Sequence, residues 1–176
     1  MSFLNKWILI FSFIPIIIGI SACTQNSDIL SSSSEESVNE KIIQEGSCVM
    51  TYLEDIDSYT AASICMKNGS YLKISAKSLI PPAELKGTDV GITMAYDWDK
   101  ENNELIFTFG PHGCEFSEPA KLCLSWKELN TNNATLYYLD EKGNHVEQLP
   151  DQIDTSKKRM CLDIKHFSRY AVAYSN

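Results

Sequence analysis

Short apolar runs separated by turn-forming residues are the feature of this chain that most constrains its fold. From Gly46 onward they recur about every ten residues, which is the spacing typical of all-β domains. Leu105, Phe107 and Phe109 alternate with other residues, as the side chains of a half-buried strand do. No helical periodicity lasts longer than two turns, although Pro82 to Lys86 is compatible with one short helical turn. The strands predicted from this pattern are 48–53, 61–66, 71–75, 90–96, 105–109, 121–126, 135–139, 145–149, 160–164 and 170–174.

Turn signals between these runs favour antiparallel pairing of neighbouring strands. Asp140-Glu141-Lys142-Gly143-Asn144 separates two of the runs, and Gly143 supplies the positive φ that a hairpin turn requires. Lys67-Asn68-Gly69-Ser70 is a second turn signal of this kind. The fold class predicted for the chain is therefore all-β, and its architecture an antiparallel β-sandwich.

The N-terminus has the three parts of an export signal. Lys6 is its only charged residue, residues 7–20 are mostly apolar, and the small residues Ser21 and Ala22 follow. A membrane span needs about 20 apolar residues, so this run is too short, and Pro15 lies in its middle. We expect residues 1–22 to be a cleaved signal peptide.

The run Ile20-Ser21-Ala22-Cys23 resembles the lipobox of bacterial lipoproteins. That resemblance implies that the Cys23 thiol is acylated, with palmitate among the expected groups, and that the chain is cut before it. The membrane, bound through this lipid anchor, would be the first partner. Thr24 is not the aspartate that retains many lipoproteins in the inner membrane. The resemblance therefore implies an outer-membrane location in a Gram-negative cell, and otherwise the outer face of the cytoplasmic membrane.

A polar segment separates the lipidation site from the strands. Residues 23–45 contain Ser31-Ser32-Ser33-Ser34 and then Glu35-Glu36, a composition that buries too little apolar surface to fold. We expect a flexible linker there and the β-sandwich domain over residues 46–176. Without its signal the chain has 14 basic and 23 acidic residues, a net charge of −9. Such a charge repels phosphate backbones and disfavours nucleic acid as a partner.

Five cysteines follow Cys23, and export places them where disulfides persist. Cys123 and Cys161 each alternate with core-type residues, so both are expected on outer sheet faces, where they can meet across neighbouring strands. Cys48 and Cys65 would form the second pair and leave Cys114 unpaired. Spacing alone does not settle these pairings. No C-x-x-C pair or nearby histidine indicates a metal, and no cofactor is expected.

The segment from Tyr71 to Tyr174 resembles the β-sandwich domain shared by zonula-occludens proteins, netrin receptors and ankyrins. Residues 46–70 have no matching counterpart, and cysteines at positions 114, 123 and 161 depart from the family. The resemblance implies a sandwich fold. It rests on 86-KGTDVGIT-93, 109-FGPHGCEF-116, 118-EPAKLCL-124, 137-YYLDEKG-143, Leu149-Pro150 and 166-HFSRYAV-172.

Within that resemblance, His166-Phe167-Ser168 matches a self-cleavage site of some relatives. Ser168 Oγ would attack the carbonyl carbon of Phe167 with His166 as general base, and the resulting ester would hydrolyse. The alternative is structural, with Phe167 filling the core while His166 and Ser168 satisfy backbone groups at a sheet corner. Both interpretations stay open at the level of sequence.

The sequence gives little support for a calcium site or for a hydrolase. Asp97, Asp99, Glu101 and Asn103 are spaced like the ligands of a calcium loop, but Asn102 stands where an EF-hand requires glycine. Hydrolase motifs such as G-x-S-x-G and H-E-x-x-H are absent. The leading hypothesis is a non-enzymatic interaction or structural module of the cell envelope, with an envelope protein or glycan as partner. The alternatives are self-processing at Phe167–Ser168 and a carbohydrate-binding module with a row of exposed aromatic side chains.

Overall fold

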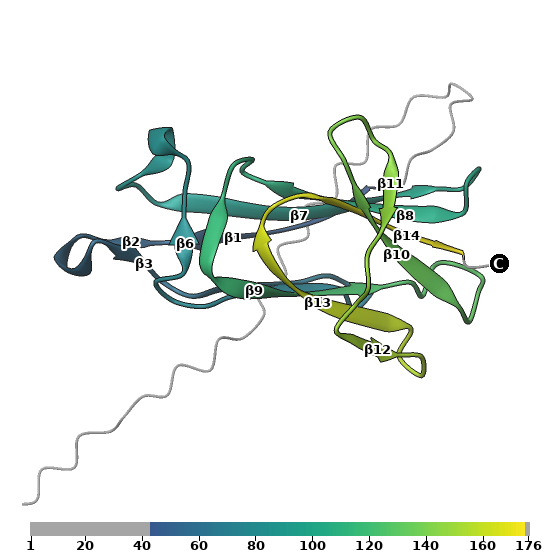
Figure 1. The fold of residues 1–176 in the computed structure, drawn as a ribbon. Helices are drawn as coiled ribbons and strands as arrows, with labels where there is room; N and C mark the ends of the chain where they lie inside the picture. The colour runs from purple at the N-terminus through teal and green to yellow at the C-terminus, as the bar shows by residue number, and fades with distance from the viewer. Residues whose placement is uncertain (1–42, 175–176) are drawn as a thin grey trace, which may run out of the picture.

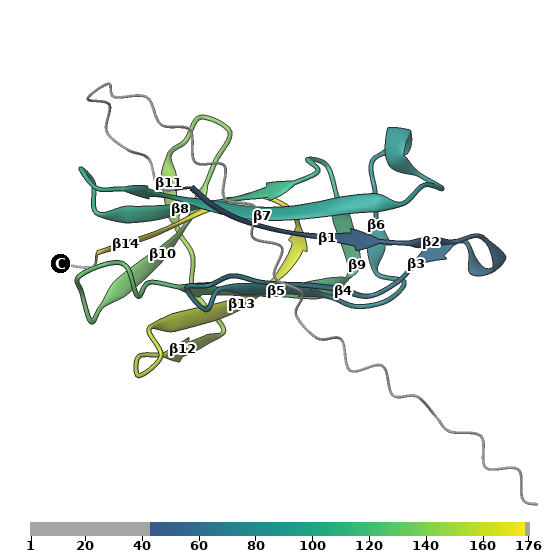
Figure 2. The ribbon, with the colours of Figure 1, turned by 180° about the vertical axis from the view of Figure 1, so that it is seen from behind.

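Two antiparallel β-sheets packed face to face form the body of the protein in the computed structural model, which describes residues 43–174. The first sheet has the strand order β1-β7-β8-β14-β10-β11. Its strands are β1 (Ile43–Met50), β7 (Val90–Asp99), β8 (Glu104–Gly110), β14 (Arg169–Tyr174), β10 (Ala134–Leu139) and β11 (His145–Glu147). Figures 1 and 2 show the two layers edge-on from opposite sides.

The second sheet has the order β12-β13-β9-β5-β4, and β6 pairs with β9 beside it. Its strands are β12 (Gln152–Asp154), β13 (Arg159–His166), β9 (Glu115–Ser125), β5 (Tyr71–Ile74), β4 (Ala62–Cys65) and β6 (Leu79–Ile80). A small hairpin of β2 (Tyr52–Leu53) and β3 (Ser58–Tyr59) projects beyond one end of the layers (Figure 1). The short 3-10 helices are η1 (Glu54–Ile56) and η2 (Ala83–Leu85).

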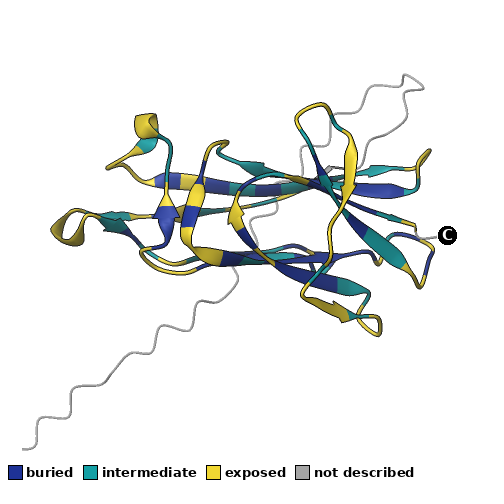
Figure 3. Cartoon of the chain, viewed as in Figure 1, coloured by how far each residue is buried: buried dark blue, intermediate teal, exposed yellow. Residues whose placement is uncertain are grey.

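The core lies between the layers and is built by alternation along the strands. In β7, every second residue from Val90 to Tyr96 is buried, while Gly91 between them is exposed. In the second sheet, Leu122 and Leu124 of β9 and Leu162 of β13 are buried against this face. The alternation of buried and exposed segments is visible along the central strands in Figure 3. Burial of these apolar side chains is the main stabilising contribution to such a fold.

The predicted all-β sandwich is confirmed, with differences at the element boundaries. The first strand begins at Ile43, three residues before the predicted domain boundary at Gly46. β9 begins at Glu115 and includes Pro119, which lies where the pairing with β13 is irregular, between Ile164 and His166. Proline has no N–H to donate, so an irregular stretch is where a strand tolerates it. The proposed signal peptide, Cys23 and most of the linker lie outside the described residues.

Candidate functional site

The connection between β13 and β14 contains the His166-Phe167-Ser168 triplet singled out from the sequence. β13 belongs to the second sheet and β14 to the first, so residues 167–168 carry the chain from one layer to the other. The yellow end of the ribbon in Figure 1 makes this crossing. The irregular pairing between Ile164 and His166 lies just before it, as expected where a strand bends and a side chain is re-aimed.

Phe167 anchors the crossing in the core. Its ring is 4% exposed, stacks on Phe109 at 5.7 Å between centroids and meets Phe116 edge-on at 5.1 Å. Its backbone N–H donates to the carbonyl oxygen of Cys114 over 3.1 Å. These contacts fix the carbonyl group of Phe167 relative to its neighbours, and they bear out the structural role considered for this residue.

His166 and Ser168 form a hydrogen-bonded pair on the surface above Phe167. Ser168 Oγ lies 2.8 Å from His166 Nδ1, and the same nitrogen lies 3.3 Å from the Phe167 carbonyl oxygen. With the imidazole proton on Nε2, Nδ1 accepts the Ser168 hydroxyl proton, which is the arrangement of a nucleophile and its base. His166 is exposed, so water reaches the pair.

The backbone of the triplet carries no left-handed residue. The described non-glycine residues with positive φ are Asp57, Lys77, Asn103 and Lys158, all away from this corner. An acyl shift is assisted by a strained peptide bond, and such strain is not visible in the φ angles here. The triplet therefore has the paired side chains for self-cleavage within an ordinary strand-to-strand connection.

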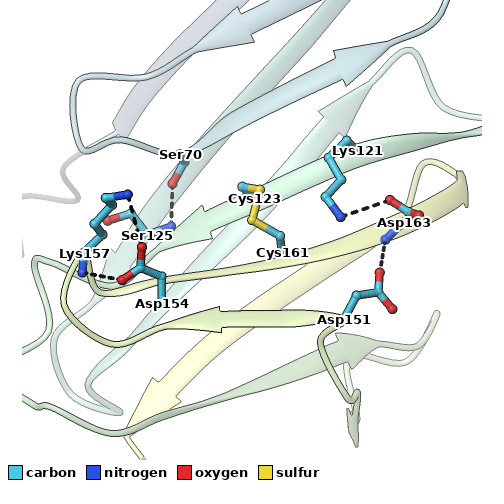
Figure 4. Close-up of a disulfide and its surroundings, with 9 residues drawn as sticks. All are labelled: Ser70, Lys121, Cys123, Ser125, Asp151, Asp154, Lys157, Cys161 and Asp163. Atoms are coloured by element: carbon cyan, nitrogen blue, oxygen red, sulfur yellow. Dashed lines mark hydrogen bonds and ion pairs between the residues drawn. A yellow bond between two sulfur atoms is a disulfide. The ribbon is translucent and has the colours of Figure 1, made fainter.

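The predicted pairing of Cys123 with Cys161 is confirmed. The two residues are directly opposite in the register of β9 and β13, with their Cα atoms 4.0 Å apart, and their sulfur atoms are bonded. Leu122, Leu124 and Leu162 point inward, so the disulfide lies on the outer face of the second sheet. Figure 4 shows that the disulfide and the ion pair of Lys121 with Asp163 join the same two strands, β9 and β13.

The expected pair of Cys48 with Cys65 is wrong, because Cys48 is a free thiol. Cys48 shares the inward face of β1 with Met50 and packs against the core, whereas Cys65 alternates with the inward Ile64 of β4 in the other sheet. Side chains on an inner face and on an outer face cannot meet across a packed core. Desolvation raises the pKa of the Cys48 thiol to about 11. Cys114 is also free, as expected, and is buried.

Neither a metal site nor an aromatic row emerges between residues 43 and 174. No group of three metal-binding side chains occurs in that range. Asp99 instead accepts hydrogen bonds from the backbone N–H groups of Glu101 and Asn102, as in a solvated turn. Trp126 is buried, and Tyr174 is the one aromatic residue among the large exposed hydrophobic side chains described. Nor does any helix in this part of the chain have the length and apolarity of a membrane span.

Two features of the surface had no signal in the sequence. Glu104 is buried at the start of β8, and its Oε2 lies 2.7 Å from His145 Nε2 on β11. A cavity of about 530 Å³ opens on the outer face of the second sheet, beside Tyr71 and Arg159. The residues of each feature are far apart in sequence and belong to no recognisable motif, so only the strand order brings them together.

Comparison with known proteins gives no match to any family model or to any curated protein.

Proposed function

We propose that this protein is a lipid-anchored, non-enzymatic module of the cell envelope, held by acylated Cys23 through its linker. The lipobox-like run at residues 20–23 supplies the anchor. The sandwich supplies a rigid body of a kind used for interaction with other molecules, in keeping with its resemblance to the zonula-occludens, netrin-receptor and ankyrin domain.

One observation carries the extracytoplasmic part of the proposal. Cys123 and Cys161 are opposed across adjacent strands and bonded. Structural disulfides are rare in a reducing cytosol and persist after export, so a protein built around this bond suits an oxidising compartment.

The test is to express the full chain in a bacterium that processes lipoproteins and to measure the mass of the N-terminal peptide. We expect a fragment that begins at Cys23 and carries acyl groups, together with membrane-bound protein. Cys23→Ala should abolish acylation, whereas the control Cys48→Ala should leave it unchanged. An unacylated, cytosolic chain with Cys123 and Cys161 reduced would contradict the proposal.

A second candidate function is self-processing at the Phe167–Ser168 bond, favoured by the 2.8 Å contact between Ser168 Oγ and His166 Nδ1. His166 would take the hydroxyl proton as Oγ attacks the Phe167 carbonyl carbon. The C–N bond then breaks, the Ser168 nitrogen receives the proton, and an ester joins Phe167 to Ser168 Oγ. Water hydrolyses that ester to a Phe167 carboxylate and a free Ser168. Residues 169–174 of the product would stay paired with β8 and β10.

Intact mass measured after denaturation tests this second candidate. Cleavage predicts two fragments divided before Ser168, and hydroxylamine should accelerate their appearance by attacking the ester. Ser168→Ala should abolish cleavage and His166→Gln should slow it, while Ser156→Ala serves as a matched control on another loop. A single intact mass before and after hydroxylamine would eliminate self-processing and leave the envelope-module proposal standing.

A further inference from the structure

The cavity on the outer face of the second sheet has the size of a small-molecule site and a mostly polar lining. Its volume of about 530 Å³ lies in the range of ligand pockets. The hairpin of β12 and β13 forms one wall, and β5 contributes Tyr71 from the other side. The lining includes Tyr71, Gln152, Asp154, Ser156, Arg159 and the disulfide-bonded Cys161.

Arg159, which lines this cavity, has a polar atom that lacks a hydrogen-bond partner among the described residues. Its guanidinium lies over the Tyr71 ring, 5.3 Å from the centroid, and its Nε is buried without a hydrogen-bond partner. Lys73 approaches the same ring at 5.3 Å. Within residues 43–174, neither cation takes part in an ion pair.

Two neighbouring lysines are paired with acids, whereas Lys73 and Arg159 are not within the described part of the chain, and Asp151 is a further acid nearby. Lys121 pairs with Asp163 at 3.4 Å, and Lys157 pairs with Asp154 at 3.3 Å. The protein as a whole has a net charge of −8, so an uncompensated Lys73–Arg159 pair is a local exception. Two cations without an acidic partner in that part of the chain, both close to the half-buried Tyr71 ring, attract an anion.

The carboxylate of Asp154 limits which anions the cavity can bind. This carboxylate also lines the cavity, so a doubly charged group such as phosphate meets repulsion there. A single carboxylate matches the fork of one guanidinium, with two parallel N–H···O bonds. The Gln152 amide and the Asp154 oxygens then face the remainder of the ligand and can accept from hydroxyl or amide groups.

We propose that this cavity binds a small molecule with one carboxylate, which Arg159 holds bidentately, and with hydroxyl or amide donors that face Asp154 and Gln152. A sugar acid and the C-terminal end of a short peptide share this chemistry. The disulfide ties β13 to β9 beside Tyr71, which is opposite Cys123 in the register of β5 and β9, and Cys161 itself lines the cavity. The site is independent of both the lipid anchor and the His166–Ser168 pair.

The test uses the full chain with its disulfide intact and follows backbone amide signals by NMR. Glucuronate and acetyl-alanyl-alanine are titrated as the two acids, with glucose and the peptide C-terminal amide as their neutral counterparts. We expect saturable shifts confined to residues 152–161 and Tyr71 for at least one acid, with the neutral counterpart binding about tenfold more weakly or worse. Which acid binds identifies the source of the carboxylate.

Variants at one position decide whether the guanidinium is responsible. Arg159→Gln should weaken binding about tenfold or more, and Arg159→Lys, which retains the charge and stem but not the fork, should lose several-fold. Arg169→Gln makes the same substitution at an exposed arginine outside the cavity and should bind as the wild type does. Unchanged signals outside the cavity show that a variant is folded.

The proposal is overturned if neither acid binds or if the neutral counterparts bind as well as the acids. Equal binding by Arg159→Gln and the wild type would also overturn it. Inorganic phosphate that displaces the acid at equal concentration would show a simple attraction of charge, and would likewise exclude a carboxylate site.

Discussion

Asp154 shows how a single side chain organises a hairpin at the residue scale. Its Oδ1 accepts from the Ser156 hydroxyl at 2.6 Å and from the Lys157 N–H at 3.1 Å, and its Oδ2 pairs with Lys157 Nζ. These hydrogen bonds, the one from Ser156 first among them, lower the pKa of Asp154 from 3.8 to about 2. The ionised carboxylate thus closes the turn between β12 and β13 that forms one wall of the cavity.

An NMR titration of the Asp154 carboxyl carbon should therefore have its midpoint near pH 2. Since the folded value lies below the unfolded one, the stabilisation is complete above about pH 4 and is lost as the pH falls towards 2. Ser156→Ala removes the hydrogen bond that contributes most to the lowered pKa of Asp154, so it should move the midpoint upward. Ser156→Thr retains the hydroxyl and should leave the midpoint unchanged. An unmoved midpoint in the alanine variant would refute this account.

At the scale of elements, the β10–β11 hairpin depends on one backbone angle. Gly143 has a φ of +81°, and Asp140 accepts hydrogen bonds from the N–H groups of Lys142 and Asn144 to close the turn. A Cβ at Gly143 would meet nothing within 4 Å, so the cost of adding one is purely conformational. This hairpin places His145 beside Glu104, joining the edge of the first sheet to its centre.

Gly143→Ala should lower the free energy of unfolding by about 1–2 kcal/mol, because a left-handed conformation is unfavourable for a residue with a Cβ. Gly91→Ala is the matched control, since it also meets open space but lacks a positive φ. That variant should be neutral or slightly stabilising. Urea denaturation of both variants measures the difference, and equal stabilities would contradict the explanation.

Patterns that are local in sequence predicted structure well, and those that depend on sheet order did not. Alternation around Cys123 and Cys161 predicted their outer-face pairing because side-chain direction follows from strand parity. The pairing of Cys48 with Cys65 was assigned only to the cysteines that remained, and it failed because nothing in the sequence places β1 and β4 in different sheets. The His166–Ser168 pair was visible because its members are two residues apart. Tyr71 and Arg159 were not, since only β9 brings their strands near each other.

At the scale of the whole molecule, the disulfide closes a long loop. Cys123 and Cys161 are 38 positions apart in sequence, and the segment between them includes β10, β11 and the return from the first sheet to the second. A cross-link of this span restricts the unfolded chain, and its loss costs about 2–4 kcal/mol. The disulfide therefore stabilises the domain as a whole as well as the outer face on which it lies.

Replacing both cysteines, Cys123→Ala with Cys161→Ala, should lower the free energy of unfolding by about 2–4 kcal/mol. Guanidinium denaturation, with and without a reductant, measures this decrease in the free energy of unfolding. Dithiothreitol should destabilise the wild type at least as much, because it also reduces the disulfide in which Cys65 takes part. Cys48→Ala, which removes a free thiol that is only partly buried, tests whether the effect is specific to the bond. Equal midpoints for oxidised wild type and double variant would contradict the prediction.

The position of β14 has a consequence for the order in which the domain assembles. β14 lies in the middle of its sheet, between β8 and β10, so this layer consists of two separate pieces until residues 169–174 pair with both neighbours. One piece is the row β1-β7-β8 and the other is the hairpin of β10 and β11. Insertion of this single segment is therefore the step that unites them.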